Sequence, residues 1–288
     1  MNEMTRRQWA RLALGGIAAG ALTGAAADRK SSIVKGVQIG AQSYSFRDRP
    51  LDDAIRAMNE IGLSSCELWS GHVEPKDLDR DARRVWRITT SLNHFRLIGE
   101  KFKSAGIELY AYNYSFRDDF TDQEIQRGFE MAKALGAKAI TASATVNTAR
   151  RVDAYARDYK IRVGMHNHSN IRPNEFATPD DFARAMEGNS EYICINLDIG
   201  HFTAAGFDAV DFLQKHHNRI VSLHIKDRKR NQGDNVPFGQ GDTPIKQVLQ
   251  LLSKNRWKIP ANIEYEYKGE DTVAEVRKCY EYCRSALG

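Results

Sequence analysis

Short apolar segments with the character of β-strands alternate with longer segments of helical periodicity from residue 36 to the end of this chain. Repeated strand–helix units predict a parallel sheet with helices outside it, and eight of them predict an α/β fold closed into a (β/α)8 TIM barrel. An open doubly wound sheet is the alternative, but no glycine-rich phosphate turn follows the first strand. The eight strands are expected at residues 36–44, 64–69, 107–112, 137–141, 162–166, 192–198, 220–226 and 261–265.

The first 27 residues have the layout of an export signal. The twin-arginine pair Arg6-Arg7 precedes an apolar run of small residues at 12–22, and Ala25-Ala26-Ala27 supplies a cleavage site. An amphipathic first helix is the weaker interpretation, because the run contains several glycines. We therefore predict a signal peptide at 1–27, and a periplasmic or otherwise exported protein. Cleavage leaves 261 residues, close to the roughly 250 of one TIM barrel.

The helices of the predicted barrel are expected at residues 51–61, 89–105, 122–135, 148–159, 179–186, 208–215, 245–253 and 272–286. No linker or low-complexity segment interrupts the alternation, so residues 28–288 are predicted to form one domain. No later stretch is apolar for long enough to cross a bilayer, so no membrane partner is expected after cleavage.

The net charge argues against a nucleic-acid-binding protein, and the cysteines add little information about the class of protein. The net charge of +5 falls to +3 without residues 1–27, which hold three arginines and one glutamate. That charge does not indicate a nucleic-acid partner. None of the four cysteines forms a CxxC pair, and Cys66 and Cys194 lie in apolar strands typical of core positions. Cysteine content therefore does not indicate a cellular compartment.

Four successive predicted strands each end near a residue that can bind a metal. These residues are His166, Asp198, His224 and Glu264. Side chains alternate along a barrel strand between the interior and the helices, and in three of these strands the opposite face is apolar. All four candidates therefore point inward near the C-terminal ends of the strands, where barrel enzymes keep their chemistry. The mixed nitrogen and oxygen set predicts one divalent ion, such as manganese, cobalt, zinc or magnesium.

Asp198-Ile199-Gly200-His201 is the sharpest motif. The aspartate closes the strand, the glycine permits a tight turn, and His201 follows within reach of the same pocket. A capping aspartate with a surface histidine is the alternative, and His166, His168 or His224 taken singly could each be a hydrogen-bonded core histidine. Glu264 is harder to explain by packing, because a buried carboxylate needs a partner.

These features resemble the xylose isomerase-like barrel superfamily, which includes sugar epimerases, inosose dehydratases and endonuclease IV. The resemblance covers the chain from about Gly36 to its end and includes the stretch Glu67-Leu68-Trp69-Ser70-Gly71-His72. It implies a fold of eight strand–helix units and a metal held by strands five to eight. Asp198, His224 and Glu264 match three of the ligands in the epimerases. The resemblance also implies that His201 and Arg228 contact the substrate.

The fourth ligand position departs from the epimerase pattern, because His166 stands where those enzymes carry a glutamate. That glutamate is a ligand and also one of two proton-transferring carboxylates. His166 can bind a metal as a neutral imidazole, but it cannot accept a proton on the same nitrogen. Glu264 is therefore expected to be the catalytic base, with His168 or His201 as its partner.

Six residues near the strand ends are predicted to contact the substrate. They are Tyr44, Glu67, Trp69, His72, Lys226 and Arg228. The aromatic side chains of Tyr44, Trp69, Phe46, Tyr112 and Tyr114 could stack on a sugar ring, although barrel-mouth packing is an equal alternative for each. The pentapeptide Tyr44-Ser45-Phe46-Arg47-Asp48 recurs as Tyr114-Ser115-Phe116-Arg117-Asp118, and nothing beyond the lining of a pocket is inferred from the repeat.

Three functions remain open from the sequence. The preferred one is a metal-dependent sugar isomerase or epimerase that moves a proton next to a metal-bound carbonyl. The main alternative is a metal-dependent lyase or deglycosidase that acts on 3-keto-glycosides by elimination. A non-catalytic sugar-binding protein is the third. A nuclease of the endonuclease IV type is disfavoured, because it needs more metal ligands. The expected partner is a small-molecule sugar or glycoside, and a homo-oligomer is compatible with the sequence.

Overall fold

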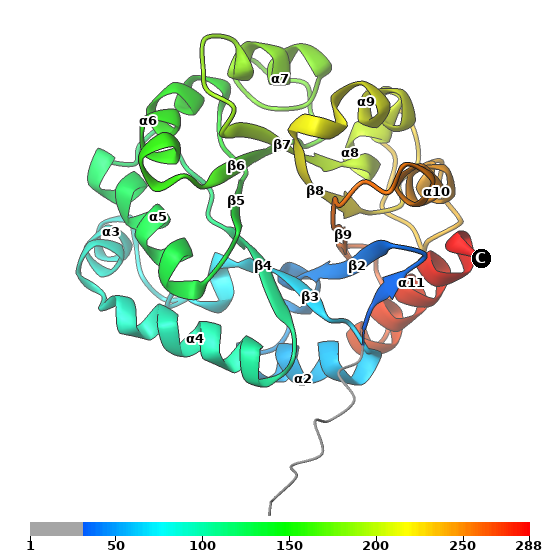
Figure 1. Cartoon of the computed structure of the whole chain (residues 1–288), viewed down its shortest axis with the longest axis horizontal. Helices are drawn as coiled ribbons and strands as arrows, with labels where there is room; N and C mark the ends of the chain where they lie inside the picture. Colours follow the sequence, from blue (N-terminus) through cyan, green and yellow to red (C-terminus); the bar gives the residue numbers. More distant parts are fainter. Residues whose placement is uncertain (1–30) are drawn as a thin grey trace, which may run out of the picture.

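Parallel strands close into a barrel in the computed structural model, which describes residues 31–288. Each strand pairs with its neighbour in chain order, and β2 also pairs with β9 to complete the ring. Figure 1 looks down the barrel, with the strands around the centre and the helices outside them. The predicted (β/α)8 fold is confirmed. The barrel strands are β2 (Val37–Gln42), β3 (Ser65–Trp69), β4 (Glu108–Asn113), β5 (Ala139–Ala142), β6 (Arg162–His166), β7 (Ile193–Asp198), β8 (Ile220–Ile225) and β9 (Ala261–Ile263).

Every expected barrel strand is present, and no end differs from its prediction by more than two residues. One additional strand, β1 (Ile33–Val34), pairs antiparallel with the start of β2. The turn between them contains Lys35 and Gly36, both at positive φ. A two-residue strand is too short to give a periodic signal in the sequence.

Strand β8 departs from simple alternation at Val221. Pairing with β7 passes from Ile220 to Ser222, so Val221 is the extra residue of a bulge. Strict alternation from His224 would make Val221 face the helices, and the structure contradicts this. Val221 packs with Cys194 in a small cluster that also contains Ala111 and Ala139, separate from the main core. Beyond the bulge the predicted alternation resumes, so His224 still points inward.

The outer helices agree closely with the sequence prediction. They are α2 (Leu51–Ile61), α4 (Leu92–Ser104), α5 (Asp122–Leu135), α6 (Ala149–Tyr159), α7 (Pro179–Met186), α9 (Ala209–His216), α10 (Ile245–Asn255) and α11 (Thr272–Leu287). Local capping explains several boundaries. Thr121 and Glu124 form a reciprocal capping box on α5, and Gly136 ends that helix in the left-handed conformation.

Two helices were not expected. α3 (Arg80–Thr89) occupies what was predicted to be a loop, and α8 (Ile199–Ala204) follows β7 directly. α3 fully buries only Arg87, and its apolar residues Trp86 and Ile88 are half-buried, so arginines dominate the sequence of this helix. α8 is nearly all buried, and short apolar runs do not distinguish helix from strand.

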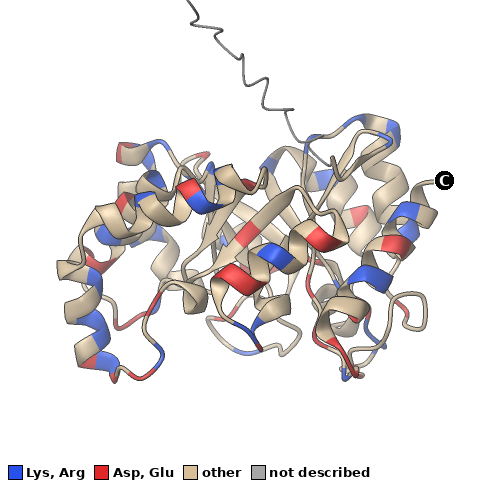
Figure 2. Ribbon diagram, turned by 90° about the horizontal axis from the view of Figure 1, so that it is seen from below, with Lys and Arg blue, Asp and Glu red and all other residues tan. Residues whose placement is uncertain are grey.

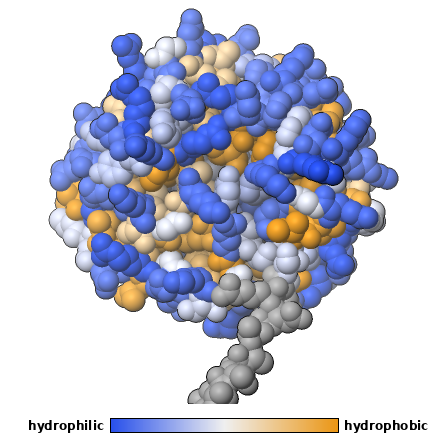
Figure 3. Space-filling view, viewed as in Figure 1, coloured by the Kyte–Doolittle hydropathy of each residue, from blue (hydrophilic) through white to orange (hydrophobic). Residues whose placement is uncertain are grey.

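The main core lies between the barrel and its helices. The outward residues of the strands, such as Ile195, Leu223 and Ile263, are fully buried there. Lys, Arg, Asp and Glu alternate along the outer helices in Figure 2. The face seen in Figure 3 is mainly hydrophilic, with apolar residues scattered between the polar ones. This distribution does not show one dominant apolar patch on that face.

No helix within residues 31–288 combines the length and apolar character needed to span a bilayer. The predicted signal peptide at 1–27 and its cleavage site lie outside the described residues. Export therefore remains a prediction from the sequence.

Candidate functional site

A polar cavity of about 390 Å³ lies where the strands end. The predicted ligands His166, His224 and Glu264 are part of its wall, and residues from the loops after β2 to β5 form the opposite wall. The lining residues are Gln42, Tyr44, Trp69, Asn113, Ser115, Arg117, Ser143, His166, His168, His201, His224, Lys226, Glu264 and Glu266. Barrel enzymes place their active sites at this end of the strands.

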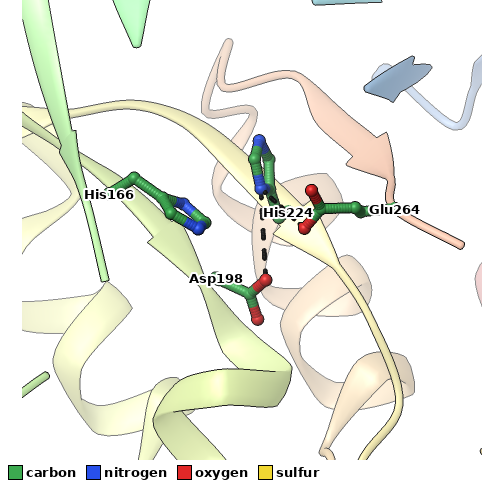
Figure 4. Close-up of side chains that lie close together, drawn as sticks. All are labelled: His166, Asp198, His224 and Glu264. Atoms are coloured by element: carbon green, nitrogen blue, oxygen red, sulfur yellow. Dashed lines mark hydrogen bonds and ion pairs between the residues drawn. The ribbon is translucent and has the colours of Figure 1, made fainter. Parts of the chain in front are cut away.

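The four predicted metal ligands come together at the base of this cavity. His166, Asp198, His224 and Glu264 each offer one ligand atom, and these atoms all lie within 4.8 Å of one another. Figure 4 shows the four side chains pointing toward a common centre. All four are buried, and the most exposed of them, Glu264, is only 7% exposed. Their spacing and chemistry suit a single divalent cation.

Asn196 fixes the orientation of the His166 ring. Nδ1 of His166 lies 2.9 Å from Oδ1 of Asn196, whose amide nitrogen donates to the hydroxyl of Ser222 at 2.8 Å. The amide oxygen can only accept, so His166 carries its proton on Nδ1 and leaves Nε2 with a lone pair. Burial, followed by the neighbouring histidines, lowers the pKa of His166 well below its usual value. The ring is therefore neutral, as a metal ligand must be.

Glu67 orients the His224 ring. Nε2 of His224 lies 2.8 Å from Oε1 of Glu67, and Nδ1 lies 3.1 Å from Oε2 of Glu264. Burial opposes the charged ring, but the two carboxylates raise the pKa of His224 well above its usual value. The Nε2 proton can remain on the ring and be donated to Glu67. The Nδ1 proton must dissociate before Nδ1 can bind a cation.

Asp198 supplies the strongest indication that a cation fits. Its Oδ1 accepts the backbone N–H of His201 at 2.7 Å, which caps α8. Its Oδ2 is buried and accepts no hydrogen bond, although the ammonium of Lys226 lies 3.1 Å away. A buried carboxylate oxygen without a hydrogen bond is costly unless a cation compensates it, and Lys226 supplies one such charge. A carboxylate oxygen of Asp198 also lies within 4.8 Å of the ligand atoms of the other three predicted ligands, so the residues present fit a divalent ion.

Lys226 places a buried positive charge beside the cluster. Its ammonium lies 2.8 Å from Oε2 of Glu264 and 2.6 Å from Oε2 of Glu266. Burial alone would raise the pKa of Glu264, but Lys226 and His224 hold it well below the usual range. Burial likewise opposes the charge on Lys226, and the carboxylates nevertheless raise its pKa. Glu264 and Lys226 are thus both charged at neutral pH.

His168 and His201 differ in how free their rings are. His168 is exposed to the cavity and its ring makes no hydrogen bond with residues 31–288. Partial desolvation and then the charge of Lys226 lower its pKa, so it is neutral and can accept a proton. His201 lies 2.8 Å from the guanidinium of Arg228 and 3.0 Å from the ammonium of Lys226. Those contacts fix its ring against the cavity wall.

Three of the six predicted substrate contacts line the cavity, and three do not. Tyr44, Trp69 and Lys226 reach the cavity. The other three residues are not part of the cavity lining. Glu67 is fully buried inside the barrel, His72 is held by Ser43 and by the backbone of Phe46 and Arg49, and Arg228 supports His201. The structure assigns these three a supporting position in place of direct contact.

For three of the five aromatic residues, the structure agrees with the packing alternative. Phe46, Tyr112 and Tyr114 are fully buried, so they serve packing. Tyr44 and Trp69 remain on the cavity wall, with ring centroids 5.0 Å apart in an edge-on arrangement.

Several polar residues of the site were not singled out from the sequence. They include Gln42, Thr141 and Asn262, whose side chains bind Glu67 beside His224. Strand alternation could have identified Asn196 and Asn262, because each lies two residues before a ligand on the same strand face. Asn113, Ser115, Arg117 and Ser143 come from the opposite side of the barrel, where no ligand marks the strand end.

Comparison with known proteins gives one match that spans most of the chain and others that are partial or distant. Residues 55–284 match the family model described as the xylose isomerase-like TIM barrel. An L-ribulose-5-phosphate 3-epimerase, UlaE, of Escherichia coli is 30% identical over 100 residues, which are 34% of this chain and 35% of that protein. The match thus spans about a third of the length of that relative.

Among solved structures, the 3-keto-D-glucoside 4-epimerase YcjR of Escherichia coli has a TM-score of 0.66 and 15% identity, with 86% of this chain and 99% of that one covered. The IOLI protein with a bound zinc atom has a TM-score of 0.64 and 16% identity, with 86% and 95% covered. At such identities these structures support the fold alone. The family match covers well over half of the sequence, and the chain therefore belongs to the xylose isomerase-like TIM barrel family.

Proposed function

We propose that this protein is a metal-dependent sugar isomerase or epimerase. The observation that carries the proposal is the buried cluster of His166, Asp198, His224 and Glu264, with donor atoms within 4.8 Å of one another at the base of an open polar cavity. Apolar packing does not explain such a cluster, because burying each of its charges costs free energy unless an opposite charge compensates it. The cavity of about 390 Å³ is large enough for a small ligand.

A divalent cation bound by the four residues would supply Lewis acidity to a sugar carbonyl or hydroxyl pair. The chain's own groups would then handle the proton. Glu264 is charged, and its Oε2 takes the contacts with His224 and Lys226 while its Oε1 accepts no hydrogen bond from residues 31–288. Oε1 is therefore the carboxylate oxygen that is free to act as the base.

His168 is the proposed partner of Glu264 in proton transfer. It is neutral, exposed to the cavity and without a hydrogen bond. Return of the proton to the same carbon from the other face gives an epimer, and return to the neighbouring carbon gives an isomer. His201 is held between two cationic side chains, and we assign it to substrate orientation.

The names of the relatives support a sugar substrate. UlaE is named as an L-ribulose-5-phosphate 3-epimerase, and YcjR as a 3-keto-D-glucoside 4-epimerase. The zinc atom of the IOLI structure is compatible with a metal in the same fold. Because the first match is short and the others are distant, the substrate and the metal of this chain remain proposals.

Elimination on a 3-keto-glycoside is a second candidate, because the carboxylates of the cavity suit it equally well. Among the described residues that line the cavity, the only carboxylates are Glu264 and Glu266. Glu266 is paired with Lys226 at 2.6 Å, so Glu264 has no free carboxylate partner. A single carboxylate with a histidine suits removal of one proton followed by loss of a leaving group, as well as it suits proton return.

Deuterium incorporation tests the proposal. We expect the metal-loaded protein, incubated with ketopentoses, ketohexoses or 3-keto-glucosides in deuterated water, to place solvent deuterium on a carbon next to the carbonyl. His168→Gln should slow this exchange by about 10²–10⁴-fold with metal content unchanged. His217→Gln, at a histidine outside the cavity lining, is the matched control.

Each result of this test points to one function. Deuterium in an epimer or isomer supports the proposal, and release of the leaving group supports elimination. Tight sugar binding without exchange in any substrate would show a binding protein and refute both enzymatic proposals.

A further inference from the structure

A second cavity adjoins the one that contains the metal-ligand cluster. It has a volume of about 350 Å³ and shares Trp69, Ser115 and Arg117 with the first. The remaining wall comes from the segment after β3, from α3 and from Phe120. Because three residues belong to both walls, the two cavities form neighbouring compartments of one groove. The second compartment is nearly as large as the first.

Three arginines of the second compartment are already paired. Arg87 donates to both oxygens of Glu74, at 2.8 and 2.9 Å. Arg80 donates to Asp119 at 2.6 Å and to Glu124 at 2.8 Å. The guanidinium of Arg83 donates to backbone carbonyls, one at 2.8 Å. The acidic residues of this wall, Glu74 and Asp119, are therefore neutralised by their own partners.

Arg117 is the unpaired cation at the junction. It is exposed, it lines both cavities, and its guanidinium makes no hydrogen bond or ion pair with residues 31–288. Its charge acts on Asp119 only at longer range, as a minor contribution to the lowered pKa of that carboxyl. The repeated pentapeptide provides an internal comparison. Arg47, in the first copy, donates to the backbone carbonyls of Tyr44 and Tyr265. The same motif thus produces a structural arginine at one place and an unpaired arginine in the groove at the other.

We propose that the substrate is a two-part glycoside whose second part carries an anionic group, held by Arg117 in the second compartment. This inference rests on the proposed function, because it assumes that a sugar occupies the metal-ligand cluster. A guanidinium binds carboxylate through two parallel hydrogen bonds. Trp69 and Phe120 add apolar surface to the same compartment, so a ring bearing a carboxylate suits it better than a bare anion.

Binding measurements with matched probes test this assignment. The probes are 4-carboxyphenyl β-D-glucopyranoside, its neutral methyl ester and glucose 6-phosphate, titrated calorimetrically into the metal-loaded protein. We expect the acid to bind at least about tenfold more tightly than the ester, since a hydrogen-bonded charge pair is worth that much or more. Arg117→Gln should abolish the preference, and Arg117→Lys should retain part of it. Arg56→Gln removes an equal charge from the exposed surface of α2 and should leave the preference intact.

Two results would overturn the inference: equal affinity for acid and ester in the wild type, or a preference that survives Arg117→Gln. Glucose 6-phosphate bound as tightly as the acid, with the same loss in Arg117→Gln, would assign Arg117 to a phosphate on a single sugar and refute the two-part substrate. Failure of the proposed function gives a different result from failure of this inference. A protein without deuterium exchange can still prefer the acid, and one with exchange can show no preference.

Discussion

Glu67 is the residue whose role differs most between sequence and structure. Its position before Trp69 suggested contact with a substrate, yet its carboxylate is fully buried and bonded to His224 and to several neutral side chains. The sequence predicts that Glu67 points inward, because alternation determines the face. Its depth below the cavity depends on where β3 sits relative to β8, which no local pattern specifies.

At this scale, Glu67→Gln is expected to weaken metal binding by about 10- to 100-fold, the usual effect of losing a carboxylate behind a histidine ligand. Glutamine keeps the shape of the side chain but removes the charge that orients the Nε2 proton of His224. Competition with a chromophoric chelator measures the affinity, and thermal unfolding verifies that the variant folds. An unchanged affinity in a folded variant would show that Glu67 does not support the ligand.

The grouping of the four proposed ligands was predictable from the sequence, because each lies at or next to the end of a strand whose alternation could be followed. Arg117 was not, since an exposed arginine in a loop has no periodic context. Its lack of a partner, compared with Arg47, becomes evident only from the hydrogen bonds of both copies.

At the scale of elements, α8 brings the site together by close contact with the end of β8. A Cβ at Gly200 would lie 2.7 Å from the backbone oxygen of Lys226. Gly200 was predicted to permit a tight turn; it instead lies in a helix and allows close approach. The sequence identified the need for glycine but not its cause, because a close contact between two elements depends on the tertiary fold.

Gly200→Ala should therefore destabilise the protein by about 1–3 kcal/mol, the common cost of overpacking, and should also weaken metal binding. The reason is that α8 begins at the ligand Asp198 and would be pushed away from Lys226. Urea unfolding and chelator competition measure the two effects. Thr203→Ser, in the same short helix, is a control that adds no atoms. Wild-type metal affinity in Gly200→Ala would contradict the proposed coupling.

The link between α3 and α5 should be sensitive to acid. Burial opposes the charge on Glu124, but hydrogen bonds from Arg80 and from the backbone of Thr121 lower its pKa overall. A lowered pKa in the folded state gives stability that is present above the unfolded value, about 4.3, and is lost as the pH falls through the folded pKa.

Glu124→Gln is accordingly expected to lose about 1.5–3 kcal/mol at pH 7, the range for hydrogen bonds to charged groups. The difference from wild type should shrink as the pH falls below 4. Urea unfolding at a series of pH values measures it. A difference that stays constant from pH 7 to the acid range would contradict the role of the charged carboxylate.

At the scale of the whole molecule, the fold was the most predictable level. Strand–helix alternation repeats eight times, and each unit is long enough to give its own signal. α3 was missed because arginines dominate its sequence and Arg87 is the only residue it fully buries, although three of its arginines line the second cavity. The least predictable features are thus those that shape the groove above the proposed metal ligands.

Export is the prediction that concerns the full chain. The pair Arg6-Arg7 and the Ala25-Ala26-Ala27 site predict transport by the twin-arginine route. We expect a tagged full-length protein to appear in the periplasmic fraction of its bacterial host with residues 1–27 removed. Replacing both arginines by lysine should retain the uncleaved protein in the cytoplasm. Equal distribution of wild type and variant would refute the signal.

The central claim is that the four strand-end residues bind one divalent cation. Elemental analysis after reconstitution with manganese, cobalt, zinc or magnesium and removal of loosely bound ions tests it most directly. The account predicts one ion per chain in the wild type and in Glu266→Gln, and a large loss in Asp198→Asn and Glu264→Gln. A folded wild-type protein that retains none of these metals, or variants of the cluster that retain them fully, would contradict it.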